Sequence, residues 1–262
     1  MKLAASNIGW LAKDDHEVLS FLQAQGFSGL EVAPGRVVEG NPYDHWQEAS
    51  DFAKKVHRDF GLKIASMQSI WFGRQENIFR SKEERETLLK VTFKAIDFAS
   101  AMECTNLVFG CPGQRNMEPL GQEEIAKEFF LKIGDYAASH GVVFALEANP
   151  PIYHTNFMNH TKDVLEWASM LNHPGIAVNL DIGTMVENKE SAELLQGKVN
   201  LIHHVHLSHP YLEPVPALEL HNEVKEGLQA ENYKNYVSLE MKAGDLIVWK
   251  KSAAYLAEVF QK

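Results

Sequence analysis

The 262-residue sequence carries a formal charge of −10, with 45% apolar and 23% charged residues. This mixture is typical of a folded globular protein, and the acidic balance disfavours sequence-independent binding to nucleic acid or to an anionic membrane. No apolar run approaches the length of a membrane-spanning helix, and polar residues 13–15 come too early for a secretory leader. Two cysteines form no disulfide framework, so we expect a reducing, cytoplasmic location.

Short apolar runs recur along the chain, each followed by a longer segment with helical periodicity. The expected strands are residues 3–7, 29–33, 62–66, 106–110, 142–147, 176–181, 201–208 and 236–240. The expected helices are residues 14–25, 43–60, 82–102, 122–140, 161–171, 191–195, 217–228 and 249–259. Gly26, Gly61 and Gly141 stand where a left-handed residue is expected to end a helix.

The alternation of strands and helices predicts parallel strand pairing with right-handed crossovers. Eight units of roughly 33 residues each match the average unit of a (β/α)8 barrel. A doubly wound sheet is the competing fold, but it usually shows a glycine-rich phosphate turn after its first strand, and residues 6–10 are not such a turn. We therefore expect an α/β fold, with a single (β/α)8 TIM-barrel domain over residues 1–262.

Four consecutive expected strands carry a metal-competent residue at or near their carboxyl end. These residues are Glu147, Asp181, His206 and Glu240, and each is about one strand–helix unit from the next. Active sites of TIM barrels lie at this end of the strands, so the four side chains are expected to converge. Taken singly, each acid is more simply read as a helix cap and the histidine as a core residue; their joint occurrence favours a site.

Three converging carboxylates would repel one another, and one or more would take up a proton unless a cation were bound. An imidazole with three carboxylates suits one divalent metal ion, either Mn²⁺, Mg²⁺, Co²⁺ or Zn²⁺. The sequence therefore predicts a metal site made by these four residues.

The segments around the four residues resemble the xylose-isomerase-like TIM-barrel superfamily. The motifs are LEAN at 146–149, NLDIGT at 179–184, HVHLS at 204–208 and SLEM at 238–241. The group contains sugar and sugar-phosphate isomerases and epimerases, inosose dehydratase and family 2 AP endonucleases. The resemblance implies that Glu147, Asp181, His206 and Glu240 bind the metal, and that Glu147 and Glu240 also exchange protons with the substrate.

Other positions depart from the ketohexose 3-epimerases of this group. Thr184, His209 and Tyr153 stand where those enzymes have a substrate-contacting His, a Glu and a second acid. The metal-binding pattern is thus kept while the substrate-binding pattern differs, and we do not expect the known ketohexose specificity. AP endonucleases need more histidines at strand ends, and residues 67–69 and 111–113 contain none. DNA cleavage is the least expected activity.

Residues in the loops after the strands are candidates for substrate binding: Glu31, Gln68, Trp71, Arg74, Asn149 and His209. For Glu31 the alternative is a structural ion pair, and for Trp71 it is packing. Arg74 could hold a phosphate or carboxylate in its bidentate fork, or lie in solvent. His221 is expected on the exposed face of its helix.

The sequence thus predicts a divalent-metal-dependent isomerase or epimerase that acts on a small sugar or sugar phosphate through an enediolate, with Glu147 and Glu240 as acid and base. The alternatives are a lyase on the same metal site, resembling inosose dehydratase and acting on a keto-polyol, or a non-catalytic sugar-binding barrel. The expected partner is a small sugar or polyol, with no nucleic acid and no membrane. Whether the chain forms a homo-oligomer is left open.

Overall fold

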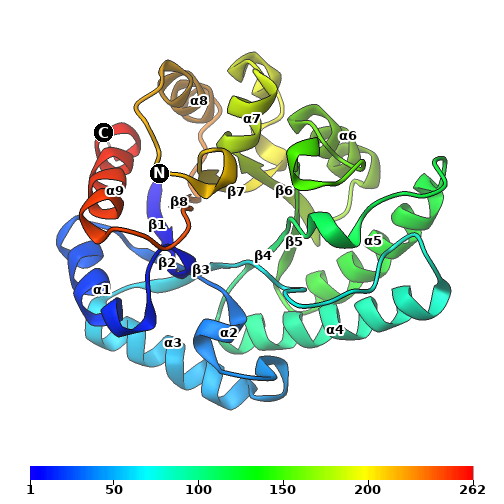
Figure 1. Cartoon of the computed structure of the whole chain (residues 1–262), viewed down its shortest axis with the longest axis horizontal. Coiled ribbons are helices and arrows are strands. Elements are labelled where there is room, and N and C mark those ends of the chain that lie inside the picture. The colour runs from blue at the N-terminus through cyan, green and yellow to red at the C-terminus, as the bar shows by residue number, and fades with distance from the viewer. Residues whose placement is uncertain (262) are drawn as a thin grey trace.

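Eight parallel strands close into a barrel in the computed structural model, which describes residues 1–261 (Figure 1). The strands follow one another around the barrel in chain order, and pairing of the last strand with the first closes it. They are β1 (Lys2–Ser6), β2 (Gly29–Val32), β3 (Lys63–Met67), β4 (Asn106–Phe109), β5 (Val143–Glu147), β6 (Ile176–Asp181), β7 (Ile202–Leu207) and β8 (Tyr236–Leu239). The prediction of a single-domain TIM barrel is confirmed.

Helices form a ring around the strands, as Figure 1 shows. They are α1 (Asp15–Ala24), α2 (Pro34–Val37), α3 (Trp46–Phe60), α4 (Lys82–Ala101), α5 (Glu123–Ser139), α6 (Thr161–Leu171), α7 (Ile182–Asn188), α8 (Glu219–Ala230) and α9 (Leu246–Phe260). Strands such as β2 and β4 are buried at every position, because one face looks into the barrel and the other is covered by helices. Within residues 1–261 we find no helix that is both long enough and apolar enough to cross a membrane.

Local sequence signals set several helix ends. The Ser81 hydroxyl caps α4 by accepting a hydrogen bond of 3.1 Å from the Glu84 amide. Gly61 ends α3 with φ of 71°, a left-handed conformation that is easily adopted without a Cβ atom. Gly26 and Gly141 also have positive φ, as predicted.

The segment after β6 differs from the prediction. Residues 191–195 were expected to be the helix of this unit, but they contain only a short 3-10 turn, Ala192–Leu195. The helix of this unit is α7, which begins directly after the strand because the Asp181 carboxylate accepts a 2.8 Å hydrogen bond from the Thr184 amide and caps it. Asp181 therefore lies at a strand end and a helix start at once, and a helix of seven residues is too short for its periodicity to be recognised.

Candidate active site

A cavity of about 200 Å³ opens at the carboxyl ends of β3 to β8. Glu147 is the last residue of β5, Asp181 is the last of β6, and Glu240 follows β8 directly; all three line this cavity. His206 lies in β7 and is completely buried beside them. The four residues predicted from the strand ends are thus brought together at one end of the barrel.

Ligand atoms of three of the four residues lie close enough together to share one ion. One ligand atom from each of Asp181, His206 and Glu240 lies within 4.8 Å of the other two. Glu147 meets the same imidazole: His206 Nδ1 is 3.0 Å from Glu147 Oε1 and 3.2 Å from Glu240 Oε2. A single ion could contact Asp181, His206 and Glu240, with Glu147 beside them.

Glu31 lies behind His206 and has no exposed surface. Its Oε2 is 2.9 Å from His206 Nε2 and 3.0 Å from His204 Nε2, while its Oε1 accepts a 3.1 Å hydrogen bond from Gln68. Burial raises the pKa of Glu31, but the charge of His206 and hydrogen bonds from both histidines outweigh this effect and hold it well below its usual value. Glu31 therefore orients His206 rather than facing the cavity.

The Asp181 carboxylate is held by the start of α7 and by the residue after β7. Its Oδ2 accepts hydrogen bonds of 2.8 Å from both the amide and the hydroxyl of Thr184, and its Oδ1 accepts one from the Ser208 hydroxyl. Burial, together with the negative charges of Glu147 and Glu240, raises the pKa of Asp181 to about 7. The carboxylates are therefore mutually unfavourable when no cation is present.

Amide side chains fix the orientation of Glu147. Asn179 donates a 2.6 Å hydrogen bond to its Oε1, and Asn149 donates one of 3.2 Å to its Oε2. At Gly110, just after β4, an added Cβ would lie 2.6 Å from Glu147 Oε2, so the absence of a side chain there makes room for the carboxylate. Neither Asn179 nor Gly110 was a predicted site residue; the signals that could have indicated them are the NLDIGT motif, which begins at Asn179, and the position of Gly110 directly after a strand.

Arg115 is a further residue near the site, and no sequence pattern indicates it. Its side chain is fully buried, one terminal nitrogen donates a 2.8 Å hydrogen bond to the Glu147 carbonyl, and the guanidinium lies 5.4 Å from the centre of the Phe109 ring. Nε and the other terminal nitrogen have no hydrogen-bond partner among the described residues. Burial lowers the pKa of Arg115 to about 10, so the group stays charged beneath the end of β5.

His206 and Glu240 also have shifted pKa values. Burial lowers the pKa of His206, but the negative charges of Glu240 and Glu31 outweigh burial and raise it well above its usual value. Burial raises the pKa of Glu240 although His206 opposes the shift. A protonated imidazole therefore compensates part of the negative charge wherever no metal is bound.

The donor set fits a divalent cation. Nδ1 of His206 is buried, has no hydrogen bond of good geometry, and faces Glu147 and Glu240. When Nε2 carries the ring proton it donates to Glu31, and the Nδ1 lone pair is then free for an ion. Three carboxylates with one imidazole nitrogen are ligands typical of Mn²⁺, Mg²⁺, Co²⁺ or Zn²⁺.

The predicted substrate-binding residues fall into two groups. Gln68 and Asn149 line the cavity. Trp71 does not, because its ring is buried against Phe109 and its indole nitrogen donates a 3.0 Å hydrogen bond to Thr92. Trp71 therefore packs in the core, which was the alternative to contact with a sugar.

Arg74 and His209 also lie outside this cavity. Arg74 lines a separate cavity and forms an ion pair of 3.1 Å with Glu76. His209 lies near His221 and contributes to lowering the pKa of that residue. His221 itself is fully buried, contrary to the surface position expected from its helix, because α9 covers it and the Tyr255 hydroxyl lies 2.9 Å from its Nδ1.

Two further residues with titratable side chains line the cavity, Tyr153 and Cys111. The Tyr153 hydroxyl accepts a 2.8 Å hydrogen bond from the Tyr211 amide, and burial raises its pKa to about 12. Burial also raises the pKa of Cys111 to about 12, so its thiol stays neutral and unreactive. Tyr153 and Cys111 therefore add uncharged surface beside the three carboxylates.

The chain belongs to the xylose isomerase-like TIM barrel family, whose pattern matches residues 19–260. No curated protein matches it by sequence. Solved structures share the fold over nearly the full length of both chains. One is the 3-keto-D-glucoside 4-epimerase of E. coli, with a TM-score of 0.80, 18% identity, and coverage of 98% of this chain and 99% of the other.

Two other solved structures with the same fold belong to proteins whose names indicate different classes of substrate. The D-psicose 3-epimerase of Clostridium cellulolyticum, solved with D-tagatose, has a TM-score of 0.81 and 14% identity, covering 100% of this chain and 98% of the other. A family 2 AP endonuclease of Brucella melitensis has a TM-score of 0.74 and 19% identity, covering 98% and 99%. At these identities the similarity establishes the fold and leaves the activity to the site.

Proposed function

We propose that this protein is a divalent-metal-dependent isomerase or epimerase of a sugar or sugar derivative. The observation that carries the proposal is the meeting of Glu147 and Glu240 at the same nitrogen of His206, at 3.0 and 3.2 Å, with Asp181 beside them in one cavity. The epimerases that share the fold are named for sugar substrates, which supports the same substrate class here.

Glu147, Asp181, His206 and Glu240 would hold the ion. A divalent cation bound there supplies a Lewis acid that stabilises negative charge on substrate oxygens. Asp181 and His206 have fixed partners, in Thr184 and Glu31, and so act as ligands that do not move.

Glu147 and Glu240 are the groups that move the proton in this proposal. They come from β5 and β8, on different sides of the cavity wall, so that one carboxylate takes a proton from the carbon beside the substrate carbonyl and the other returns one. The amide groups of Asn149 and Asn179 keep the Glu147 carboxylate in a fixed orientation.

The test is proton exchange in D₂O. Metal-loaded protein is incubated with ketoses and keto-glycosides, and carbon-bound deuterium and product configuration are followed by NMR. We expect deuterium at one carbon and an epimeric or isomeric product. In Glu240→Gln the rate falls about 10²- to 10⁴-fold, whereas Glu166→Gln, a matched change at an exposed residue of α6, leaves it unchanged.

Other outcomes distinguish the remaining hypotheses. A product lighter by one water would identify a lyase instead. Sugar binding without exchange or turnover would identify a non-catalytic barrel. Cleavage of a DNA duplex at an abasic site would identify a nuclease. Any of these results would overturn the proposed isomerase.

A further inference from the structure

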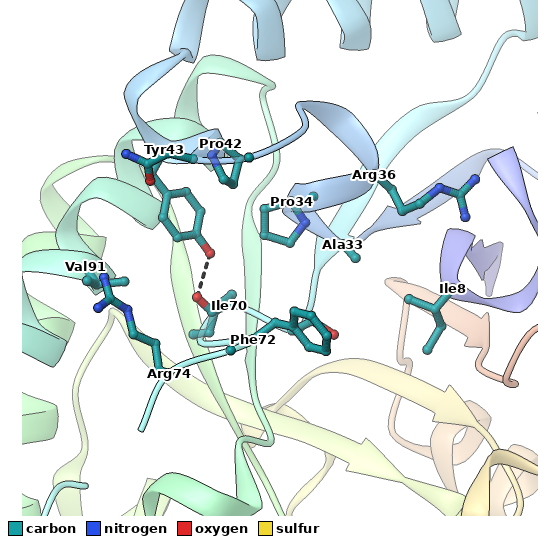
Figure 2. Close-up of a pocket in the computed structure, with 15 residues that line it drawn as sticks. Ile8, Ala33, Pro34, Arg36, Pro42, Tyr43, Ile70, Phe72, Arg74 and Val91 are labelled. Atoms are coloured by element: carbon teal, nitrogen blue, oxygen red, sulfur yellow. Dashed lines mark hydrogen bonds between the residues drawn. The ribbon is translucent and has the colours of Figure 1, made fainter. Parts of the chain in front are cut away.

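A second, larger cavity lies beside the cavity that the three carboxylates line, over the carboxyl ends of β1 to β3 (Figure 2). Its volume is about 600 Å³, against about 200 Å³ for the cavity with the three carboxylates. Its wall comes from Ile8 after β1, residues 33–43 after β2, residues 69–74 after β3, and one residue of α4. Ser69 lines both cavities, so they adjoin one another across the segment after β3.

The wall of the larger cavity is mainly apolar and carries an exposed aromatic ring. Phe72 is 93% exposed, the highest value among the large hydrophobic residues within positions 1–261. Figure 2 shows its ring between Ile8 and Ile70, below Pro34. An aromatic face left open in a concave apolar wall is a typical contact for a planar group or the apolar face of a sugar ring.

The backbone holds Phe72 in this exposed position. Ser69 has φ of 55° and Gly73 has φ of 79°, and the Phe72 amide donates a 3.0 Å hydrogen bond to the Ser69 carbonyl. The neighbouring Trp71 is buried and bonded to Thr92, so it anchors the turn to α4. A non-glycine residue with positive φ is uncommon, and here it occurs where the two cavities meet.

Both arginines in the wall already have partners. One terminal nitrogen of Arg36 lies 2.6 Å from Asp15 Oδ1, and the other donates to the carbonyls of Trp10, at 2.7 Å, and of Asn7. Arg74 pairs with Glu76 at 3.1 Å. Because each cation is compensated by an acid, this cavity suits an uncharged ligand better than a phosphate.

The volumes of the two cavities indicate how a ligand would be divided between them. Sites for ligands of drug size have volumes of about 300–1,000 Å³, a range that includes the larger cavity and excludes the smaller one. The smaller cavity has the charged groups that the reaction needs, and the larger one has none that is unpaired among those described above. One substrate would place its reacting sugar in the smaller cavity and a second group in the larger one.

We propose that the cavity around Phe72 is a subsite for an uncharged second group, a further sugar ring or an aryl aglycone, attached to the sugar that reacts. The substrate class is then a glycoside rather than a free monosaccharide or a sugar phosphate. This inference rests on the proposed function for the identity of the reacting sugar, but the binding subsite can be measured without turnover.

The kinetic test compares two keto-glycosides that differ only in the aglycone, methyl or phenyl. We expect a kcat/KM for the phenyl compound at least about tenfold above that for the methyl compound. Phe72→Ala lowers this ratio at least about fivefold. Met170→Ala, an exposed apolar residue at the far end of α6, keeps the ratio of the unaltered protein. A ratio near one, or a ratio that Phe72→Ala does not change, would overturn the proposal.

A binding measurement separates failure of the subsite from failure of the proposed function. Unreactive phenyl glucoside, methyl glucoside and glucose 6-phosphate are titrated calorimetrically into the metal-loaded protein. We expect the phenyl compound to bind at least about tenfold more tightly than the methyl compound, and Phe72→Ala to abolish the difference. Equal binding of the two glucosides, or tightest binding of the phosphate, contradicts the subsite. Absence of proton exchange with every substrate would contradict the proposed isomerase activity. The calorimetric comparison of the two glucosides would still decide whether the subsite exists.

Discussion

Each ring nitrogen of His206 faces a carboxylate. Nε2 is 2.9 Å from Glu31, and Nδ1 lies within 3.2 Å of both Glu147 and Glu240. A carboxylate behind a ligating histidine fixes the orientation of the ring and raises its basicity as a ligand. Glu31 thus contributes to the site without contacting the cavity, which explains why a strand-end acid is found completely buried.

Arg115 provides a prediction at the scale of one residue. Its guanidinium is buried and bonds to the Glu147 carbonyl at 2.8 Å. In Arg115→Met we expect kcat to fall about 10- to 100-fold with KM changed less than threefold, since the end of β5 loses its support. The melting temperature stays equal or rises, because a buried charge with unpartnered nitrogens is replaced by an apolar side chain.

Measured together, kcat and the melting temperature show whether Arg115 positions Glu147 or only stabilises the fold. Arg58→Met, which changes an exposed arginine of α3, is the matched control and should alter neither kcat nor the melting temperature. A large fall in melting temperature with unchanged kcat in Arg115→Met would show that the residue serves only the fold.

At this scale the strand-end residues could be predicted, whereas of the loop residues only those next to a strand end, Gln68 and Asn149, were placed correctly. A parallel barrel gathers strand ends at one rim, so Glu147, Asp181 and His206 are related by the fold itself. The direction of a loop side chain depends on local turns. Trp71 and Phe72 are adjacent in sequence, yet one is 2% and the other 93% exposed.

Among the elements, β4 is followed directly by a glycine that leaves space for the Glu147 carboxylate. An ideal Cβ at Gly110 lies 2.6 Å from Glu147 Oε2, whereas one at Gly113 has no atom within 4 Å. We predict that Gly110→Ala lowers kcat at least about tenfold by displacing the carboxylate, with a stability loss of about 1–3 kcal/mol. Gly113→Ala is the control in the same loop. Equal kcat values for the two variants, measured at saturating metal, would be inconsistent with the fixed position of Glu147.

The contact between α8 and α9 predicts an acid-sensitive stability. His221 is buried beside the Tyr255 hydroxyl, and burial lowers its pKa to about 4. A histidine whose folded-state pKa is below its unfolded value stabilises the fold fully above pH 6.5, and this contribution is lost as the pH falls toward 4. At pH 5 the loss amounts to about 2 kcal/mol.

The measurement is urea unfolding at pH 7.5 and pH 5 for the unaltered protein and for His221→Gln. The decrease in free energy of unfolding between the two pH values should be smaller by about 2 kcal/mol in the variant. Other titrating groups are common to both proteins and cancel in this comparison. Equal decreases would mean that His221 is not held neutral between the two helices.

Helix α7 shows why one element was predicted at the wrong place. The helical pattern of residues 191–195 predicts the helix of the sixth unit there, but the chain forms a helix from Ile182 onward. The cause is Asp181, whose carboxylate caps α7 through the Thr184 amide at 2.8 Å. An aspartate at the end of a strand looks the same in the sequence whether it faces the site or caps a helix. The structure shows that Asp181 does both.

For the molecule as a whole, the number of strand–helix units predicted a closed barrel, which is confirmed. The division of the barrel's rim into two cavities could not be predicted. It depends on how the loops of residues 33–43 and 69–74 pack against each other. The cavity with the three carboxylates occupies the ends of β3 to β8, and the larger cavity, whose arginines are paired with acids, occupies the ends of β1 to β3. A substrate that spans both is the simplest use of this arrangement.

The proposed function depends above all on Glu147, Asp181, His206 and Glu240 forming one divalent metal site. The most direct test is calorimetric titration of chelator-treated protein with Mn²⁺, Co²⁺, Mg²⁺ and Zn²⁺ at pH 7.5. We predict one ion per chain for at least one of these metals, and at least about tenfold weaker binding in Asp181→Asn, in which the uncharged amide is the poorer ligand. Binding of none of the four metals, or equal affinity in Asp181→Asn, would contradict the account.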